Sequence, residues 1–121
     1  MTPPRLAGIL VYTSRARFDA LRAFYVDVLD LIPRSDRDGF VNFEFGDQRL
    51  TIAVHDSVEG PTGEPDRIMI NFATGDIDSS YARAVDAGAP PIRPPSAESW
   101  GGRVATIADP DGNLVQFLEL P

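Results

Sequence analysis

The sequence predicts an α+β fold built from two βαβββ modules. Three observations support this prediction. The first half shows a strand pattern, a helix pattern and further extended segments; a segment rich in glycine, proline and acids stands near the middle; and the second half repeats the order of the first. We expect residues 1–121 to form a single domain, with module 1 at 6–56, a linker at about 57–66 and module 2 at 67–120.

The first strand and the helix of module 1 follow from hydrophobic periodicity. Residues 6–13 (LAGILVYT) are a short apolar run with β-branched side chains, which is typical of a strand. Ser14 is a suitable cap for a helix that runs to about Asp30. Apolar side chains spaced three and four residues apart predict one buried stripe on this helix: Phe18, Leu21, Tyr25 and Val28.

The rest of module 1 is predicted to be extended. Residues 31–37 lead into Asp38-Gly39, which is a strong hairpin signal. Apolar and polar residues then alternate on both sides of a Gly46-Asp47 turn, and this alternation predicts two strands, at 40–45 and 49–55.

Module 2 repeats these signals after the linker. Residues 67–73 (RIMINFA) predict a strand, and Asp76 or Asp78 is expected to cap a helix that ends near Gly88. Residues 89–95 contain four prolines, so a strand there has to lie at the edge of a sheet. The last two strands are predicted as a hairpin, at 102–108 and 113–120, across the turn Asp109-Pro110-Asp111-Gly112.

Composition excludes several classes of chemistry and partner. The chain has no cysteine, which excludes disulfides, thiolate metal sites and cysteine nucleophiles. All 11 basic residues are arginine, so Schiff-base chemistry on lysine is excluded as well. The net charge of −7 disfavours nucleic acid and anionic membrane surfaces as partners. No apolar run is long enough to span a membrane or to resemble a signal peptide, and we therefore expect a cytoplasmic protein.

Three segments together resemble the vicinal oxygen chelate superfamily, which comprises glyoxalases, bleomycin-resistance proteins and extradiol dioxygenases. Residues 23–31 (AFYVDVLDL) look like its first-helix signature, with Asp30 where glycine is usual. Residues 99–106 (SWGGRVAT) and 109–114 (DPDGNL) look like its final hairpin. The resemblance covers nearly the whole chain and implies two βαβββ modules that form a curved mixed sheet.

Metalloenzymes of this superfamily hold their metal at four matched strand positions. The resemblance places these positions at Leu10, or at Ile9 if the following loop is one residue longer, and at Ile52, Met69 and Gln116; aligning the two hairpin turns pairs residues 50–52 with 114–116. None of these side chains supplies an imidazole or a carboxylate, the groups that such a site requires. Strand alternation turns His55 and Glu119 away from these positions. We therefore expect no metal and no other cofactor.

The resemblance suggests a mostly apolar pocket with a few amide and hydroxyl groups, as small-molecule sites usually have. The alternative is that the same side chains pack a closed core. Trp100 lies on a glycine-flanked loop, where it either borders the pocket as a lid or packs locally. The predicted ligand-binding residues are Leu10, Tyr12, Ile52, Val54, Met69, Asn71, Trp100 and Gln116.

These features favour a metal-independent protein that binds a small, partly apolar organic molecule, with a cation as one option because the chain is acidic. Drug-sequestering proteins of the bleomycin-resistance type are the nearest model. The alternative is an enzyme of the same superfamily: a metal-dependent lyase, epimerase or dioxygenase, or a metal-free isomerase. A third possibility is a subunit with a vestigial site. The resemblance also implies a homodimer with two equivalent pockets.

Overall fold

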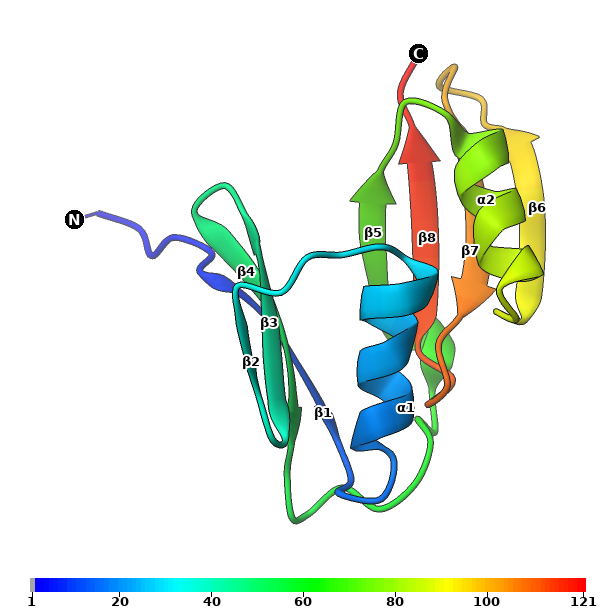
Figure 1. Ribbon diagram of the computed structural model, residues 1–121. Coiled ribbons are helices and arrows are strands. Elements are labelled where there is room, and N and C mark those ends of the chain that lie inside the picture. Colours follow the sequence, from blue (N-terminus) through cyan, green and yellow to red (C-terminus); the bar gives the residue numbers. More distant parts are fainter. Residues whose placement is uncertain (1) are drawn as a thin grey trace. The chain divides into compact units, whose positions relative to one another are not determined.

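The computed structural model describes residues 2–121 and divides into two compact units, one ending at Gly60 and the other beginning at Pro61. This boundary lies inside the segment predicted as the linker at 57–66. Each unit contains a four-stranded mixed sheet and helical segments (Figure 1). The α+β class and the two βαβββ modules predicted from the sequence are therefore confirmed.

Unit 1 has one parallel and two antiparallel strand pairs. Strand β1 lies parallel to β4, β3 pairs antiparallel with β4, and the short β2 closes the sheet, which gives the order β1-β4-β3-β2. The helical segment packs against β4. The elements are β1 (Gly8–Thr13), α1 (Phe18–Ala23), a π-helical turn (Phe24–Val28), β2 (Ser35–Arg37), β3 (Phe40–Phe45) and β4 (Gln48–Val54).

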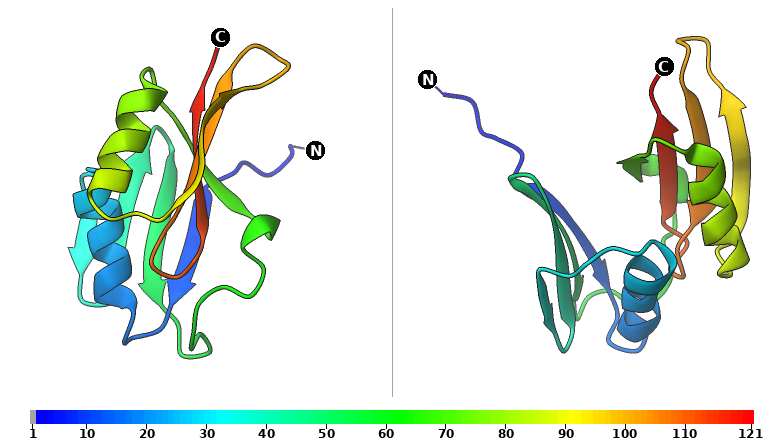
Figure 2. Two further views of the ribbon diagram at one scale, coloured as in Figure 1. Left: turned by 90° about the vertical axis from the view of Figure 1, so that its right-hand side faces the viewer. Right: turned by 45° about the horizontal axis from the view of Figure 1, so that its top comes forward.

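Unit 2 repeats this topology in the order β5-β8-β7-β6, with β5 parallel to β8. Helix α2 packs across β6, β7 and β8 (Figures 1 and 2). A single 3-10 turn, Pro65–Arg67, precedes the first strand. The elements are β5 (Met69–Ala73), α2 (Ile77–Asp86), β6 (Pro91–Ala97), β7 (Arg103–Ala108) and β8 (Leu114–Glu119).

Ion pairs and hydrogen bonds identify the sheet face that each helix covers. Arg22 of α1 pairs with Asp36 of β2, which shares a face with Val41 of β3 and Ile52 of β4. In unit 2, Arg103 of β7 pairs with Asp78 of α2. The opposite faces carry no helix of their own unit, and we call each of them the helix-free face.

The hydrogen bonds of these exposed pairs shift the pKa values of both partners. Arg103 Nη1 and Nη2 donate to the two oxygens of Asp78 over 2.9 and 2.8 Å, and this contact lowers the pKa of the Asp78 carboxyl. Arg22 lowers the pKa of Asp36 in the same way. Charge-assisted hydrogen bonds therefore connect the first turn of α2 to β7 through Asp78 and Arg103. They connect the last turn of α1 to β2 through Arg22 and Asp36.

The first helix begins later than the sequence predicted. Ser14 does not cap it: the N-cap residue is Arg17, and no side-chain cap bond is formed there. The α-helix also ends at Ala23 and continues as a π-helical turn to Val28. The buried stripe predicted for this helix is confirmed at Phe18, Leu21 and Tyr25, which are all almost fully buried.

Asp30 follows this helical segment with φ of 58°, in the left-handed region that glycine adopts most easily. The position where the family signature usually has glycine is thus a position whose backbone favours glycine. Aspartate is among the few other residues that tolerate this conformation.

The residues predicted at the two ends of the module 2 helix, and the edge position predicted for the proline-rich strand, are confirmed. Asp76 caps α2 by accepting a hydrogen bond from Ser79 N over 3.2 Å, which settles the choice between Asp76 and Asp78. Gly88 has φ of 105° just beyond the end of the helix. The proline-rich β6 lies at the outer edge of its sheet, as its composition predicted.

Candidate functional site

The helix-free face of unit 2 carries a row of polar side chains. The strand register places Asn71 of β5 beside Gln116 of β8, and Gln116 beside Thr106 of β7. Gln116 Nε2 donates a hydrogen bond to Asn71 Oδ1 over 3.0 Å. Met69 lies on the same face, one row along the strand, as the alternation of β5 predicted.

The amide pair keeps hydrogen-bonding capacity beyond this contact. Each side-chain amide has a carbonyl oxygen that accepts and an NH₂ group that donates. Within residues 2–121, the carbonyl oxygen of Gln116 and the amide nitrogen of Asn71 have no other partner. The pair therefore offers one acceptor and one donor to a bound molecule, which is the pattern complementary to a lactam, an amide or a carboxylic acid.

Apolar side chains frame this polar pair along the strands. Met69 is 39% exposed, whereas Leu114 beside it is 6% exposed. The frame consists of Met69, Val104, Leu114 and Leu118. A few placed polar groups in a mostly apolar surface are the usual composition of a small-molecule site.

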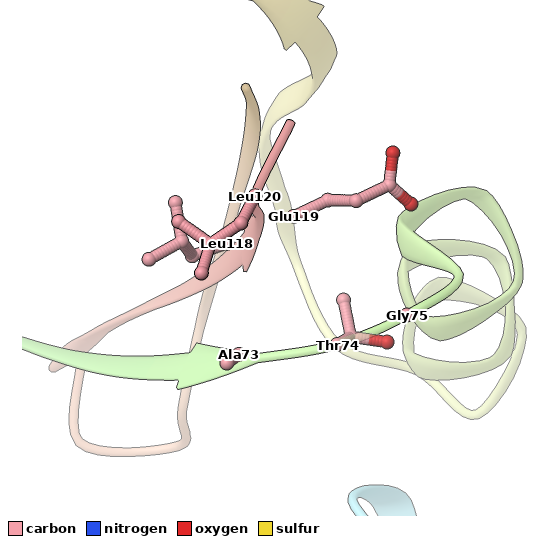
Figure 3. Close-up of a pocket in the computed structure, with 6 residues that line it drawn as sticks. All are labelled: Ala73, Thr74, Gly75, Leu118, Glu119 and Leu120. Atoms are coloured by element: carbon pink, nitrogen blue, oxygen red, sulfur yellow. The ribbon is translucent and has the colours of Figure 1, made fainter. Parts of the chain in front are cut away.

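A shallow depression of about 530 Å³ lies where β5 and β8 end (Figure 3). Its polar groups are already used to hold the first turn of α2. Glu119 Oε2 accepts a hydrogen bond from Ile77 N over 3.0 Å, and Thr74 Oγ1 lies 2.8 Å from Ser80 Oγ. We therefore assign this depression a structural role. It is lined by Ala73, Thr74, Gly75, Leu118, Glu119 and Leu120.

In unit 1 the strand register contradicts two of the four predicted ligand-binding residues, Ile52 and Val54. Leu10 pairs with Thr51 and Tyr12 pairs with Ala53, so these four residues share the helix-free face. Ile52 lies beside Val11 and is fully buried on the helix side. The prediction that Ile52 and Val54 share a face with Leu10 and Tyr12 is therefore wrong.

A one-residue slip explains this error, because successive side chains of a strand point to opposite faces. The prediction aligned the two hairpin turns as equals. The turn of unit 1 has two residues between the paired Phe45 and Gln48, whereas that of unit 2 has five between Ala108 and Leu114. Counting back from the last residues of the two strands, Val54 of β4 and Glu119 of β8, matches Gln116 with Thr51 and not with Ile52.

His55 follows β4 and lies beside Tyr12. The two rings make an edge contact with centroids 5.0 Å apart. His55 Nδ1 accepts a hydrogen bond from Ser57 N over 3.0 Å, so the neutral imidazole carries its proton on Nε2. His55 does point away from Ile52, but Ile52 lies on the helix side, so His55 lies on the helix-free face with Leu10 and Tyr12, and the prediction that it turns away from these positions is wrong. Glu119 points to the helix side, as predicted.

Trp100 lies in the tight turn between β6 and β7, where Glu98 N donates to Gly102 O over 2.9 Å. Its side chain is 51% exposed. The six-membered ring lies directly over Gly102, since a Cβ at that glycine would stand 1.9 Å from Trp100 Cζ3. Gly102, two residues after the tryptophan, thus makes room for the indole on its own turn.

Metal donors are missing from the matched positions. Leu10, Met69 and Gln116 cannot hold a divalent transition metal, and Thr51, which takes the place predicted for Ile52, supplies only a neutral hydroxyl. Within the described part of the chain, no three histidine, aspartate or glutamate side chains gather in a metal-binding group. The residues present do not fit the metal of the family's enzymes.

Sequence reasoning missed several polar or charged side chains on the helix-free face of unit 1, among them Arg37, Asn42 and Thr51. Asn42 and Thr51 are neighbours across β3 and β4 and are both buried. The alternation of residues 40–45 contained the signal, since an asparagine between buried Val41 and Phe43 has to face the other side of the sheet.

Residues 2–121 include no helix with the length and apolar character needed to cross a bilayer. A search of curated protein sequences found no match to the chain.

Solved structures with the same fold come from several bacteria. A glyoxalase-related enzyme from Fulvimarina pelagi matches with a TM-score of 0.79 and 19% identity, over 97% of this chain and 88% of that one. Lactoylglutathione lyase from Agrobacterium tumefaciens matches with a TM-score of 0.73 and 22% identity, over 98% and 95% of the two chains. TioX from Micromonospora sp. ML1 gives 0.68 and 17%, over 96% and 98%. At these identities the likeness shows the fold alone.

One family model matches a much longer part of the chain than any single sequence motif does. It extends over residues 11–117, from the first strand to the last. Together with the repeated βαβββ topology, this match shows that the chain belongs to the glyoxalase/bleomycin resistance protein/dioxygenase superfamily.

Proposed function

We propose that the protein binds a small, partly apolar organic molecule without a metal, on the helix-free face of unit 2. The Asn71–Gln116 pair carries this proposal, because its two joined amides keep one donor and one acceptor for a ligand within an apolar frame. Sequestration of an antibiotic, as by proteins of the bleomycin-resistance type, is the nearest functional model. Leaving these amides unmatched by a ligand group costs affinity, so the pair also provides specificity.

Quinolin-2-one is a suitable probe, because this flat, apolar lactam presents an N–H donor beside a carbonyl acceptor. We expect saturable binding by calorimetry. Gln116→Leu and Asn71→Leu should each weaken binding by about tenfold, since each removes a hydrogen bond of roughly 1 kcal/mol and leaves its lactam partner unmatched. Gln48→Leu, which removes an exposed amide from unit 1, is the matched control and should bind as the native chain does.

N-Methylquinolin-2-one lacks the donor that the carbonyl oxygen of Gln116 would accept, so it should bind no better than the Gln116→Leu variant binds the lactam. Equal affinity of the two probes, or of native protein and both leucine variants, would overturn the proposal. Stoichiometric zinc, nickel, manganese or iron in freshly purified protein would instead support the rival function, a metal-dependent enzyme. A lactoylglutathione lyase and a glyoxalase-related enzyme stand among the structural neighbours, which supports an enzyme as the rival.

We further propose a cytoplasmic homodimer that has neither nucleic acid nor membrane as a partner. The net charge of −7 supports the last two points, and the absence of cysteine agrees with a reducing compartment. Sedimentation equilibrium at micromolar concentration should give twice the chain mass of 13.2 kDa. A single species at the chain mass would contradict the dimer.

A further inference from the structure

The helix-free face of unit 1 carries a second candidate binding surface, built from one row of side chains across the whole sheet. Tyr12 of β1 pairs with Ala53 of β4, Ala53 with Phe40 of β3, and Phe40 with Arg37 of β2. His55 extends the row beside Tyr12. We call these five residues the Arg37 row.

Arg37 presents an exposed, positively charged guanidinium group at one end of the row. Its guanidinium carbon stands 4.3 Å from the centroid of the Phe40 ring, and the side chain is exposed. The two neighbouring carboxylates are both engaged by other arginines, Asp36 by Arg22 and Asp38 by Arg15. No carboxylate in the part of the chain that the structure describes pairs with Arg37.

The opposite end of the row supplies hydrogen-bond donors. Tyr12 is 42% exposed and carries a phenolic hydroxyl. His55 accepts at Nδ1 from Ser57 N, which leaves the Nε2–H of the neutral ring as a donor. The row contains no acid, although the chain as a whole has a net charge of −7. Its chemistry therefore selects an anion and not a cation.

The surface of the row is depressed in its middle, because the small side chain of Ala53 lies between the rings of Tyr12 and Phe40. Strands in a sheet are about 4.8 Å apart, so the backbones that carry Tyr12 and Phe40 are separated by about 10 Å. This spacing leaves room for a flat ring over Ala53. Arg37, planar and stacked on Phe40, presents its fork of N–H groups to a carboxylate at the edge of such a ring.

We propose that the Arg37 row binds a planar aromatic carboxylate. The ring lies over Ala53, the carboxylate accepts hydrogen bonds from Arg37, and a polar group at the far end meets Tyr12 and His55. All five residues belong to unit 1, and none of them belongs to the Asn71–Gln116 pair of unit 2 that carries the proposed function.

The probe is 2-naphthoate, with its neutral amide as the comparison. Calorimetry should show saturable binding of naphthoate, and Arg37→Gln should weaken it by about tenfold, because a charge-assisted hydrogen bond is lost. Arg37→Lys should recover part of the affinity through its charge. Arg5→Gln is the matched control in the same unit, since Arg5 is exposed and makes only a long ion pair of 3.7 Å with Asp47.

Ala53→Leu fills the middle of the row and should abolish naphthoate binding, with circular dichroism confirming that the variant is folded. Equal affinity for naphthoate and the neutral amide, unchanged binding by Arg37→Gln, or no binding at millimolar concentration would each overturn the proposal. Gln116→Leu should leave naphthoate binding unchanged, and Arg37→Gln should leave quinolin-2-one binding unchanged. The two proposals therefore fail separately.

Discussion

Replacing Asp109 with alanine is expected to destabilise the folded chain by about 2–4 kcal/mol. The carboxylate is 2% exposed, and it organises the turn between β7 and β8. Asp109 Oδ1 accepts from Asp111 N and from Asn113 N, each over 2.9 Å, while Oδ2 accepts from Asn113 Nδ2 over 2.9 Å. Alanine leaves three donors without this acceptor at a place that water reaches poorly.

Urea unfolding measures this effect, and the asparagine variant tests the reason for it. Asp109→Asn keeps an oxygen for the two backbone donors but sets an NH₂ group against Asn113 Nδ2, so it should lose only about 1 kcal/mol. Asp47→Ala removes an exposed carboxylate from the corresponding turn of unit 1 and is the matched control. The account is wrong if Asp109→Ala and Asp47→Ala unfold at the same urea concentration.

Gly8→Ala is expected to cost about 3 kcal/mol, because overpacking against a rigid backbone cannot relax cheaply. Gly8 pairs with Arg49 in the parallel ladder of β1 and β4. A Cβ at Gly8 would stand 1.9 Å from the carbonyl oxygen of Arg49 and 2.9 Å from its carbonyl carbon. One of the two strands therefore has to move when alanine replaces this glycine.

Gly60→Ala is the matched control, since no atom lies within 4 Å of the Cβ that it would add. Its free energy of unfolding should stay within about 0.5 kcal/mol of the native value. Because β1 also carries Tyr12, Gly8→Ala should perturb the Tyr12 and His55 ring resonances as well. A native-like melting temperature for Gly8→Ala would show that the β1–β4 pairing tolerates the added methyl group.

Local signals predicted most of the fold. Proline has no N–H group, so the composition of residues 89–95 was enough to place β6 at an edge. The Asp76 cap also depends on residues only three positions apart. Such features are determined within a few residues of the chain, and one sequence contains all the information that they need.

The candidate site depends on alignment between strands, which one sequence specifies less well. A slip of one residue in β4 exchanged Ile52 for Thr51 and moved the predicted pocket residue into the core. The start of α1 was also missed, because tertiary packing of Phe18 and Leu21, and not a cap at Ser14, positions that helix. Arg37 could not be singled out, since its availability depends on which arginines its neighbours Asp36 and Asp38 bind.

The prolines of β6 also determine in which direction the sheet of unit 2 can grow. A strand that adds to an edge needs backbone N–H groups there, and Pro91, Pro94 and Pro95 have none to offer. The register shifts between β6 and β7 make this edge irregular as well. Further strands are thus discouraged at β6, and any chain that extends this sheet by main-chain pairing has to begin at β5.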